Sequence, residues 1–254
     1  MPDFVKKDSI VREIWGNGDT ILFIFAGASA EFALNKAVDW LYFTGKLPAD
    51  PMGRLFSTVA YARQIVFSSQ EDAFKAINQI TAIHAGVEQK RGTKIPDWAY
   101  RDVLFMLIAY SISSFEVLER KLSAHEKEEV FSVFNALGQR MHIPDLATNY
   151  QQWLVQRENH LQNDLLASNF TADLFLQYHK HLGFIRFQLL LQAQHLVCPE
   201  RVKNLLKFKS IIWLKPILFV YKMARLIRIH RPFKNAILPG NYRNQIKDLD
   251  VQSG

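Results

Sequence analysis

The sequence has little cysteine: Cys198 is the single one among 254 residues. One cysteine cannot form an intrachain disulfide bond or supply the cysteine ligands of a typical structural zinc site, which agrees with a reducing compartment. The first residues, M-P-D-F-V-K-K-D-S-I, are charged and lack the apolar segment of a signal peptide. We therefore expect a cytoplasmic protein, either free or attached peripherally to a membrane.

Patterns of β-strands and membrane spans are also missing. Alternating apolar and polar residues flanked by hairpin dipeptides do not occur. The apolar run 20–25 is soon interrupted by Glu31, Asn35 and Lys36, whereas a membrane-spanning helix needs about 20 apolar residues. A chain of 254 residues suffices for one buried core. We predict a single all-α domain over residues 1–254, with about eight to ten helices judged from apolar periodicity.

Residues that cap helix N-termini divide the chain into these helices. Such residues can accept hydrogen bonds from the first backbone amides of a helix. The predicted caps are Ser68 with Glu71, Ser123 with Glu126, Thr148 with Gln151, and Thr171. The apolar segment that begins at Thr20 is predicted to continue as one helix toward Phe43.

Common catalytic motifs are absent. A carboxylate-bridged di-iron centre needs Glu-x-x-His pairs, which do not occur, and H-E-x-x-H is not completed because Glu129 follows His125 where the second histidine would stand. His179 and His181 are two residues apart and point to different sides of a helix. G-x-S-x-G, Walker A and G-x-G-x-x-G motifs are missing. A Ser-His-Asp triad stays open, and no metal-site spacing connects His142, His160, His195 and His230.

One histidine lies on a predicted inward face. This histidine is His84. It belongs to a series with three- and four-residue spacing, which forms one face of a helix: Phe74, Ile77, Ile80, Thr81, His84 and Val87. On the preceding predicted helix, Arg54 and Thr58 are one turn apart and share a face. An inward histidine is a candidate iron ligand, although inward histidines are more often hydrogen-bonded core residues. The spacing leaves both interpretations open.

An ordered series of short motifs carries a resemblance to a known family. The motifs are D-P-M-G-R-x-x-x-T from Asp50 to Thr58, Val66–Phe67, H-x-x-V from His84 to Val87, Tyr100–Arg101–Asp102, L-S-x-x-E from Leu122 to Glu126, Ile143–Pro144 and Leu238–Pro239. In order and spacing, this series resembles the α-helical oxygenases that include the rubber oxygenase (latex clearing protein) and the MpaB oxygenases.

The resemblance implies a fold, a cofactor and a reaction. The fold would have a globin-like helical core. The cofactor would be a b-type haem whose iron is bound by His84, with Arg54 and Thr58 in the haem pocket as candidate catalytic residues. The reaction would be oxidation by O2 of an isoprenoid or lipid-like substrate, either a hydrophobic small molecule or a polymer.

Three differences from the family pattern support an alternative. Where members carry Q-x-x-H-P, this chain has Asn35, Val38 and Asp39; Ser57 replaces a lysine; and the run 105–110 lacks the histidine of a W-V-H stretch. The alternative is a haem-binding or lipid-binding helical protein that acts at a membrane surface without catalysis.

Acidic residues are absent from the segment 201–247, which contains 12 Lys and Arg residues. The rest of the chain has 19 Lys and Arg against 24 Asp and Glu, so a mildly acidic body is followed by a basic arm. The arm could bind an anionic membrane surface or fold back on the acidic body. Nucleic acid is the less favoured third partner.

Overall fold

The computed structural model describes residues 2–45, 49–208 and 212–226. Within these ranges the chain forms eleven helices and no strand. Outside the helices of this described part, two isolated bridges join Asp3 to Ser69 and Asn35 to Leu165. The predicted all-α class is confirmed, with eleven helices where eight to ten were expected.

The helices differ greatly in length. In chain order they are α1 (Ile10–Gly16), α2 (Gly18–Leu34), α3 (Val38–Phe43), α5 (Pro51–Phe67), α6 (Gln70–Arg91), α7 (Asp97–Leu118), α8 (Ala124–Arg140), α9 (Tyr150–Asn163), α10 (Asn169–Val197), α11 (Glu200–Leu205) and α12 (Leu214–Leu226).

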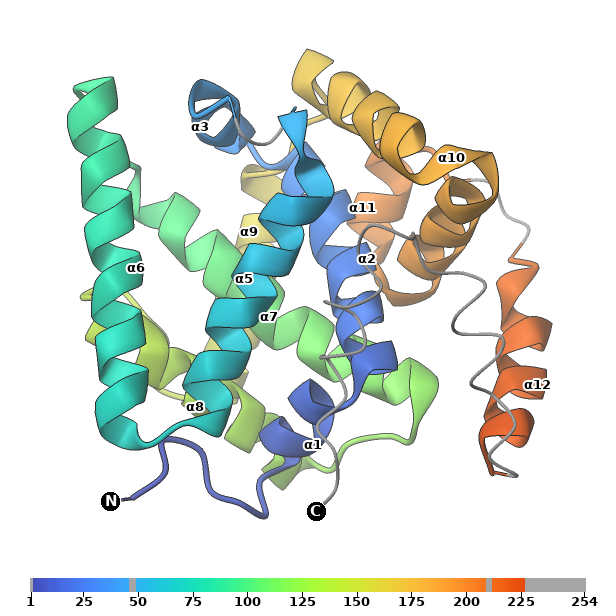
Figure 1. Ribbon diagram of the computed structural model, residues 1–254, viewed down its shortest axis with the longest axis horizontal. Helices are drawn as coiled ribbons and strands as arrows, with labels where there is room; N and C mark the ends of the chain where they lie inside the picture. Colours follow the sequence, from blue (N-terminus) through green and yellow to red (C-terminus); the bar gives the residue numbers. More distant parts are fainter. Residues whose placement is uncertain (1, 46–48, 209–211, 227–254) are drawn as a thin grey trace.

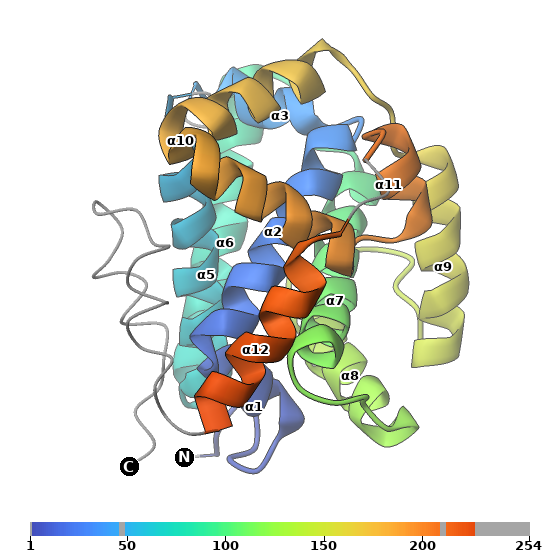
Figure 2. The ribbon, with the colours of Figure 1, turned by 90° about the vertical axis from the view of Figure 1, so that its right-hand side faces the viewer.

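Helix α2 lies at the centre of the molecule, between α7 and α10 (Figures 1 and 2). Twelve of its 17 residues are buried, which explains why its sequence is apolar almost all round. Close packing against α7 depends on Gly27, because a Cβ atom there would lie 2.1 Å from the ring of Tyr110. Apart from Asp19 in the first turn, Glu31 is the only acidic residue of α2, and it is buried in the core.

The prediction of a single helix from Thr20 toward Phe43 is wrong, because α2 ends at Leu34 and α3 follows after a turn. The Asn35 side chain stabilises this turn. Its carbonyl oxygen accepts a hydrogen bond from the backbone amide of Ala37 at 2.8 Å, and its amide donates to Asp102 at 2.8 Å. An asparagine side chain that binds nearby backbone groups competes with the helix.

The predicted capping box of Ser123 and Glu126 is confirmed. Three other caps are displaced by neighbouring polar residues that can serve equally well. The observed N-caps are Ser69 in place of Ser68, Asn149 in place of Thr148, and Ser168 with Thr171 as its reciprocal partner. Runs of adjacent cap-forming residues therefore predict a helix start only to within a few residues.

The described part of the basic arm lies against the body. In α12, the Tyr221 hydroxyl donates to Asp19 of α2 at 2.8 Å, and Lys222 donates to the backbone oxygen of Val117 at 2.8 Å. The remainder of the arm, residues 209–211 and 227–247, lies outside the described residues. Among the helices of the described ranges, none combines the length and hydrophobicity needed to cross a membrane.

Candidate functional site

His84 lies on the side of α6 that faces α7. Its imidazole packs edge-on against the Tyr100 ring, with centroids 5.2 Å apart and planes at 76°. The side chain is half-buried rather than fully enclosed. The sequence thus predicts which way His84 points, but it overstates how deeply His84 is buried.

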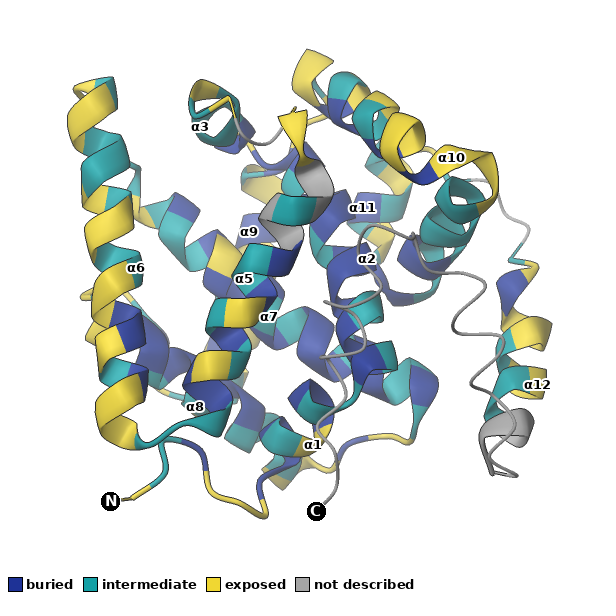
Figure 3. Ribbon diagram, in the orientation of Figure 1, coloured by how far each residue is buried: buried dark blue, intermediate teal, exposed yellow. Residues whose placement is uncertain are grey.

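The helix around His84 is covered unevenly. The buried residues of α6 are Ala73, Ala76 and Ile77, all in its first third. Beyond them, the inward residues are only half-buried, and Figure 3 shows this change along α6. These half-buried residues are Ile80, Thr81, His84 and Val87. We call them the α6 strip.

The far end of α6 is anchored to other helices. Glu88 accepts hydrogen bonds from the Tyr100 hydroxyl at 3.1 Å and from the backbone amide of Ile95 at 2.9 Å. Arg91 pairs with Asp39 at 2.6 Å and lies 4.0 Å from the centre of the Trp40 ring. The α6 strip therefore lies between the buried first third of α6 and the anchored C-terminal end of the same helix. The rest of the described chain covers the strip only partly.

Helix α5 carries the other two predicted site residues. Asp50 caps it, accepting a hydrogen bond from the Gly53 amide at 2.8 Å. Thr58 is half-buried beside the buried Val59. Arg54 is on the same helix, but its side chain lies outside what the structure describes.

Helices α5 and α6 form an antiparallel pair that diverges away from its connecting turn (Figure 1). With 1.5 Å of rise per residue, His84 lies roughly 22 Å along α6 from the turn, and Thr58 lies roughly 15 Å along α5. His84 therefore lies in the divergent part of the pair, whereas Thr58 lies near the middle of α5.

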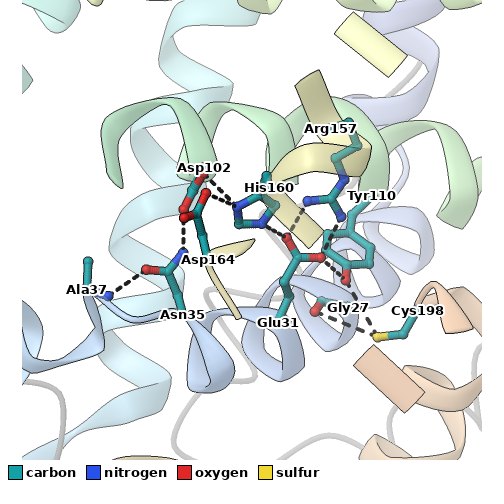
Figure 4. A network of polar contacts seen from close by, with 10 residues as sticks. All are labelled: Gly27, Glu31, Asn35, Ala37, Asp102, Tyr110, Arg157, His160, Asp164 and Cys198. Atoms are coloured by element: carbon teal, nitrogen blue, oxygen red, sulfur yellow. Dashed lines mark hydrogen bonds and ion pairs between the residues drawn. The ribbon is translucent and has the colours of Figure 1, made fainter. Parts of the chain in front are cut away.

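A second polar site, distinct from the α6 strip, is buried where α2, α7 and α9 meet (Figure 4). Its centre is Glu31, whose side chain is inaccessible to solvent. Both terminal guanidinium nitrogens of Arg157, Nη1 and Nη2, donate to its carboxylate. The Tyr110 hydroxyl donates to the same carboxylate at 2.7 Å, and His160 Nε2 lies 2.9 Å from it. Burial opposes the charge of Glu31, but Arg157 and then His160 outweigh it and lower the pKa to about 2.

The other side of the His160 ring faces two carboxylates. Its Nδ1 lies 2.6 Å from Asp102 and 3.6 Å from Asp164. Burial lowers the pKa of His160, but the contacts with Asp102 and Glu31 overcome this effect and raise it to about 9. Without another cation, His160 would therefore be positively charged at neutral pH.

A cavity of about 220 Å³ opens beside this second site. Its lining residues are mainly of polar types, and they include Asp102, His160 and Asp164. The remaining lining residues are Trp98, Arg101, Phe105, Asp145, Gln156, Asn159 and Asn163.

On the other side of the network, the Cys198 sulfur lies 3.6 Å from the Tyr110 oxygen. Burial raises the pKa of this thiol to about 12. A thiol that stays protonated is a weak nucleophile, so Cys198 fills space in the core.

The match to a protein-family model decides the family. The model for "ER-bound oxygenase mpaB/B'/Rubber oxygenase, catalytic domain" matches residues 15–241. The chain belongs to this oxygenase family. Comparison with curated proteins gives no match, and neither does comparison with solved structures.

The family match confirms the resemblance seen in the short motifs. The matched region spans most of the chain. It covers α2 to α12 and therefore both the α6 strip and the buried network around Glu31. Membership in an oxygenase family indicates O2 and an organic substrate as reactants.

Sequence reasoning missed the Glu31 network in this oxygenase-like chain. No metal-site spacing in the sequence marks His160, and Glu31 stands in the sequence only as an interruption of an apolar run. Two signals could have found them: an acidic residue inside an apolar helix, and Arg157 one turn before His160 on the face that also carries Trp153. His125, by contrast, is exposed.

Proposed function

We propose that this protein is a haem-dependent oxygenase in which His84 binds the iron of a b-type haem and O2 oxidises an isoprenoid or lipid-like substrate. The observation that carries the proposal is the position of His84 in the α6 strip, within a chain of an oxygenase family. Imidazole is a usual axial ligand of haem iron.

The α6 strip suits one face of a large apolar cofactor. Ile80 and Val87 lie one turn on either side of His84, and both are apolar and only partly covered by the described chain. A hydrophobic plane laid against them would bury this surface and exclude water from the His84 ring. The edge-on ring of Tyr100 would hold the imidazole in a fixed orientation.

The bound haem would supply the O2 chemistry, and the chain would supply orientation and electrostatics. His84 would hold the iron, and Arg54 and Thr58 would act from the neighbouring helix α5. Thr58 offers a hydroxyl donor and Arg54 a cation from α5, suited to polarised oxygen or a haem propionate. Absorption spectra of recombinant protein supplied with haem test the proposal.

The expected spectrum has a Soret band that shifts on reduction. His84→Ala should abolish or strongly alter this band while far-UV circular dichroism stays unchanged. His125→Ala is the matched control, because His125 is exposed on α8 and should leave the band intact. A parent protein that stays colourless after reconstitution would contradict the proposal.

Turnover is measured separately, as O2 consumption with a polyisoprenoid and with an unsaturated lipid. Consumption that requires both haem and substrate, with oxygen from ¹⁸O2 recovered in the product, identifies an oxygenase. A haem spectrum without consumption would favour the alternative, a non-catalytic haem- or lipid-binding protein at a membrane surface.

An exposed apolar face on α12 favours this membrane alternative. Ile217, Phe219 and Val220 are each more than half exposed, and Lys215 on the same helix is exposed too. Each basic residue near an anionic membrane contributes about 1 kcal/mol, and an apolar face can insert at the interface. We propose that α12 and the rest of the 201–247 arm attach peripherally to an anionic membrane.

Vesicle sedimentation tests the attachment. The protein should sediment with anionic but not neutral vesicles, and high salt should release it. Phe219→Asp should weaken sedimentation, since Phe219 is 67% exposed. Absence of vesicle binding would leave fold-back of the arm on the body, and binding to nucleic acid in the same salt range would identify the third partner.

A further inference from the structure

Three potential metal ligands converge at the boundary between α7 and α9. Asp102, His160 and Asp164 each offer one ligand atom, and the three atoms lie within 4.8 Å of one another. Figure 4 shows both carboxylates directed at the same edge of the His160 ring. Asp102 and His160 are buried, and Asp164 is partly accessible.

The Nδ1 atom of His160 faces this group without an aligned partner. The side chain is 2% exposed, and Nδ1 is buried and makes no hydrogen bond of acceptable geometry. Asp102 lies 2.6 Å away and forms an ion pair with this ring. The in-plane direction of a ring nitrogen is also the direction in which it binds a metal.

We propose that Asp102, His160 and Asp164 bind a divalent first-row transition metal ion, Zn²⁺ or Mn²⁺. One imidazole with two carboxylates is a donor set for such ions. The site is separate from the α6 strip: Tyr100, which contacts His84, and Asp102 are two residues apart and so point to nearly opposite sides of α7.

The outer contacts of this group are those of a metal site. Metal-binding histidines usually donate their second ring N–H to a carboxylate, and His160 Nε2 lies 2.9 Å from Glu31. Glu31 is itself fixed by Arg157. The second oxygen of Asp102 accepts a hydrogen bond from Asn35 at 2.8 Å, which leaves the first oxygen directed at His160.

The charge balance also favours a cation. Arg157 neutralises Glu31, which leaves Asp102 and Asp164 in contact with His160. Lys36 is a further cation that acts on Asp164. A divalent ion bound by the two carboxylates of Asp102 and Asp164 would balance their negative charge.

The adjoining cavity gives an ion a path to the site. Its volume of about 220 Å³ accommodates several water molecules, which could complete the coordination shell. A bound ion would join α7 to the end of α9, and because only the folded chain holds the three ligands together, binding would stabilise the fold.

Metal titration of the full chain tests the inference. The purified protein is treated with EDTA, which leaves any haem in place, and then titrated with ZnCl₂ or MnCl₂ in a calorimeter. One saturable equivalent and a metal-dependent rise in Tm are expected. Asp164→Asn should weaken binding at least about tenfold, the lower end of the effect of losing even an outer contact.

Asp145→Asn is the matched control. Asp145 lines the same cavity but is not among the three ligands, and its positive φ of 57° suits asparagine. It should bind metal like the parent. Equal affinity of the parent, Asp164→Asn and Asp145→Asn would overturn the proposal, as would the absence of saturable binding of either metal.

A spectroscopic measurement on the parent needs no variant. Pulsed EPR of the Mn²⁺-loaded protein should reveal coupling to a directly bound imidazole nitrogen. Bound Mn²⁺ without this coupling would exclude His160 as a ligand and overturn the site. All readouts are independent of the Soret band, so failure here leaves the haem proposal untouched, and the reverse also holds.

Discussion

The Tyr100 ring lies edge-on to the His84 imidazole, with centroids 5.2 Å apart, while its hydroxyl donates to Glu88 one turn further along α6. One side chain of α7 thus contacts the candidate iron ligand and the anchored end of the same helix. Substitutions of Tyr100 can therefore measure separately the effect of the ring on His84 and the effect of the hydroxyl on Glu88.

Tyr100→Phe removes the hydrogen bond to Glu88 but keeps the ring. We expect a loss of about 1 kcal/mol in the free energy of unfolding and an unchanged Soret band. Tyr100→Ala also removes the ring and should shift the Soret band or lower haem occupancy. Identical spectra for the two variants would show that the ring does not orient His84.

Replacement of Arg54 or Thr58 by alanine should lower turnover more than haem content, if both residues act in the reaction with O2 and not in anchoring the haem. A hydrogen bond to a charged group contributes about 1.5–3 kcal/mol, so turnover should fall about tenfold or more. Ser57→Ala, next to Thr58, is the control and should retain turnover. Parallel losses of haem and turnover would instead assign Arg54 and Thr58 to cofactor binding.

Glu31→Gln should be strongly destabilising. It leaves the buried Arg157 guanidinium without its carboxylate, and removing one partner of a buried ion pair costs roughly 3–5 kcal/mol. Glu158→Gln, at an exposed position on α9, should change stability by less than about 0.5 kcal/mol. Urea unfolding measures both, and similar midpoints would mean that Glu31 does not stabilise the fold.

Two glycine-to-alanine substitutions should change the free energy of unfolding of the haem-free protein in different directions. At Gly27 a Cβ atom would overlap the Tyr110 ring at 2.1 Å, so Gly27→Ala should cost about 1–3 kcal/mol or more. At Gly86 a Cβ atom would meet nothing within 4 Å, so Gly86→Ala in the helix should be neutral or stabilise by up to about 1 kcal/mol. Thermal unfolding distinguishes them.

The start of α8 should be sensitive to acid. Hydrogen bonds from Arg120 and then from the Ser123 amide lower the pKa of Glu126 to about 2, below its ordinary value of 4.5. A lowered folded-state pKa gives stability that is fully present above the ordinary value and is lost as pH falls toward 2.

Glu126→Gln should therefore reduce the fall in Tm between pH 5 and about pH 2.5, as followed by circular dichroism. Ser123→Ala should cost about 1 kcal/mol at neutral pH through loss of the cap. Unchanged acid sensitivity of Glu126→Gln would contradict the assignment.

The sequence by itself determined the all-α class and the family, and it located several helix starts to within a few residues. Helix periodicity and caps are local, so Ser123 with Glu126 could be recognised from four adjacent residues. Local spacing likewise gave the direction of His84 on α6. Whether His84 and Thr58 lie in one pocket depends on how α5 and α6 diverge, which local spacing does not encode.

Only the tertiary structure decided the buried network. Glu31 and Arg157 are 126 residues apart, and Asp102 comes from a third helix, so no sequence spacing connects them. A charged residue in an apolar helix signals that a partner must exist, because an unpaired buried charge is too costly. The packing of α2 against α7 and α9 determines which residues those partners are.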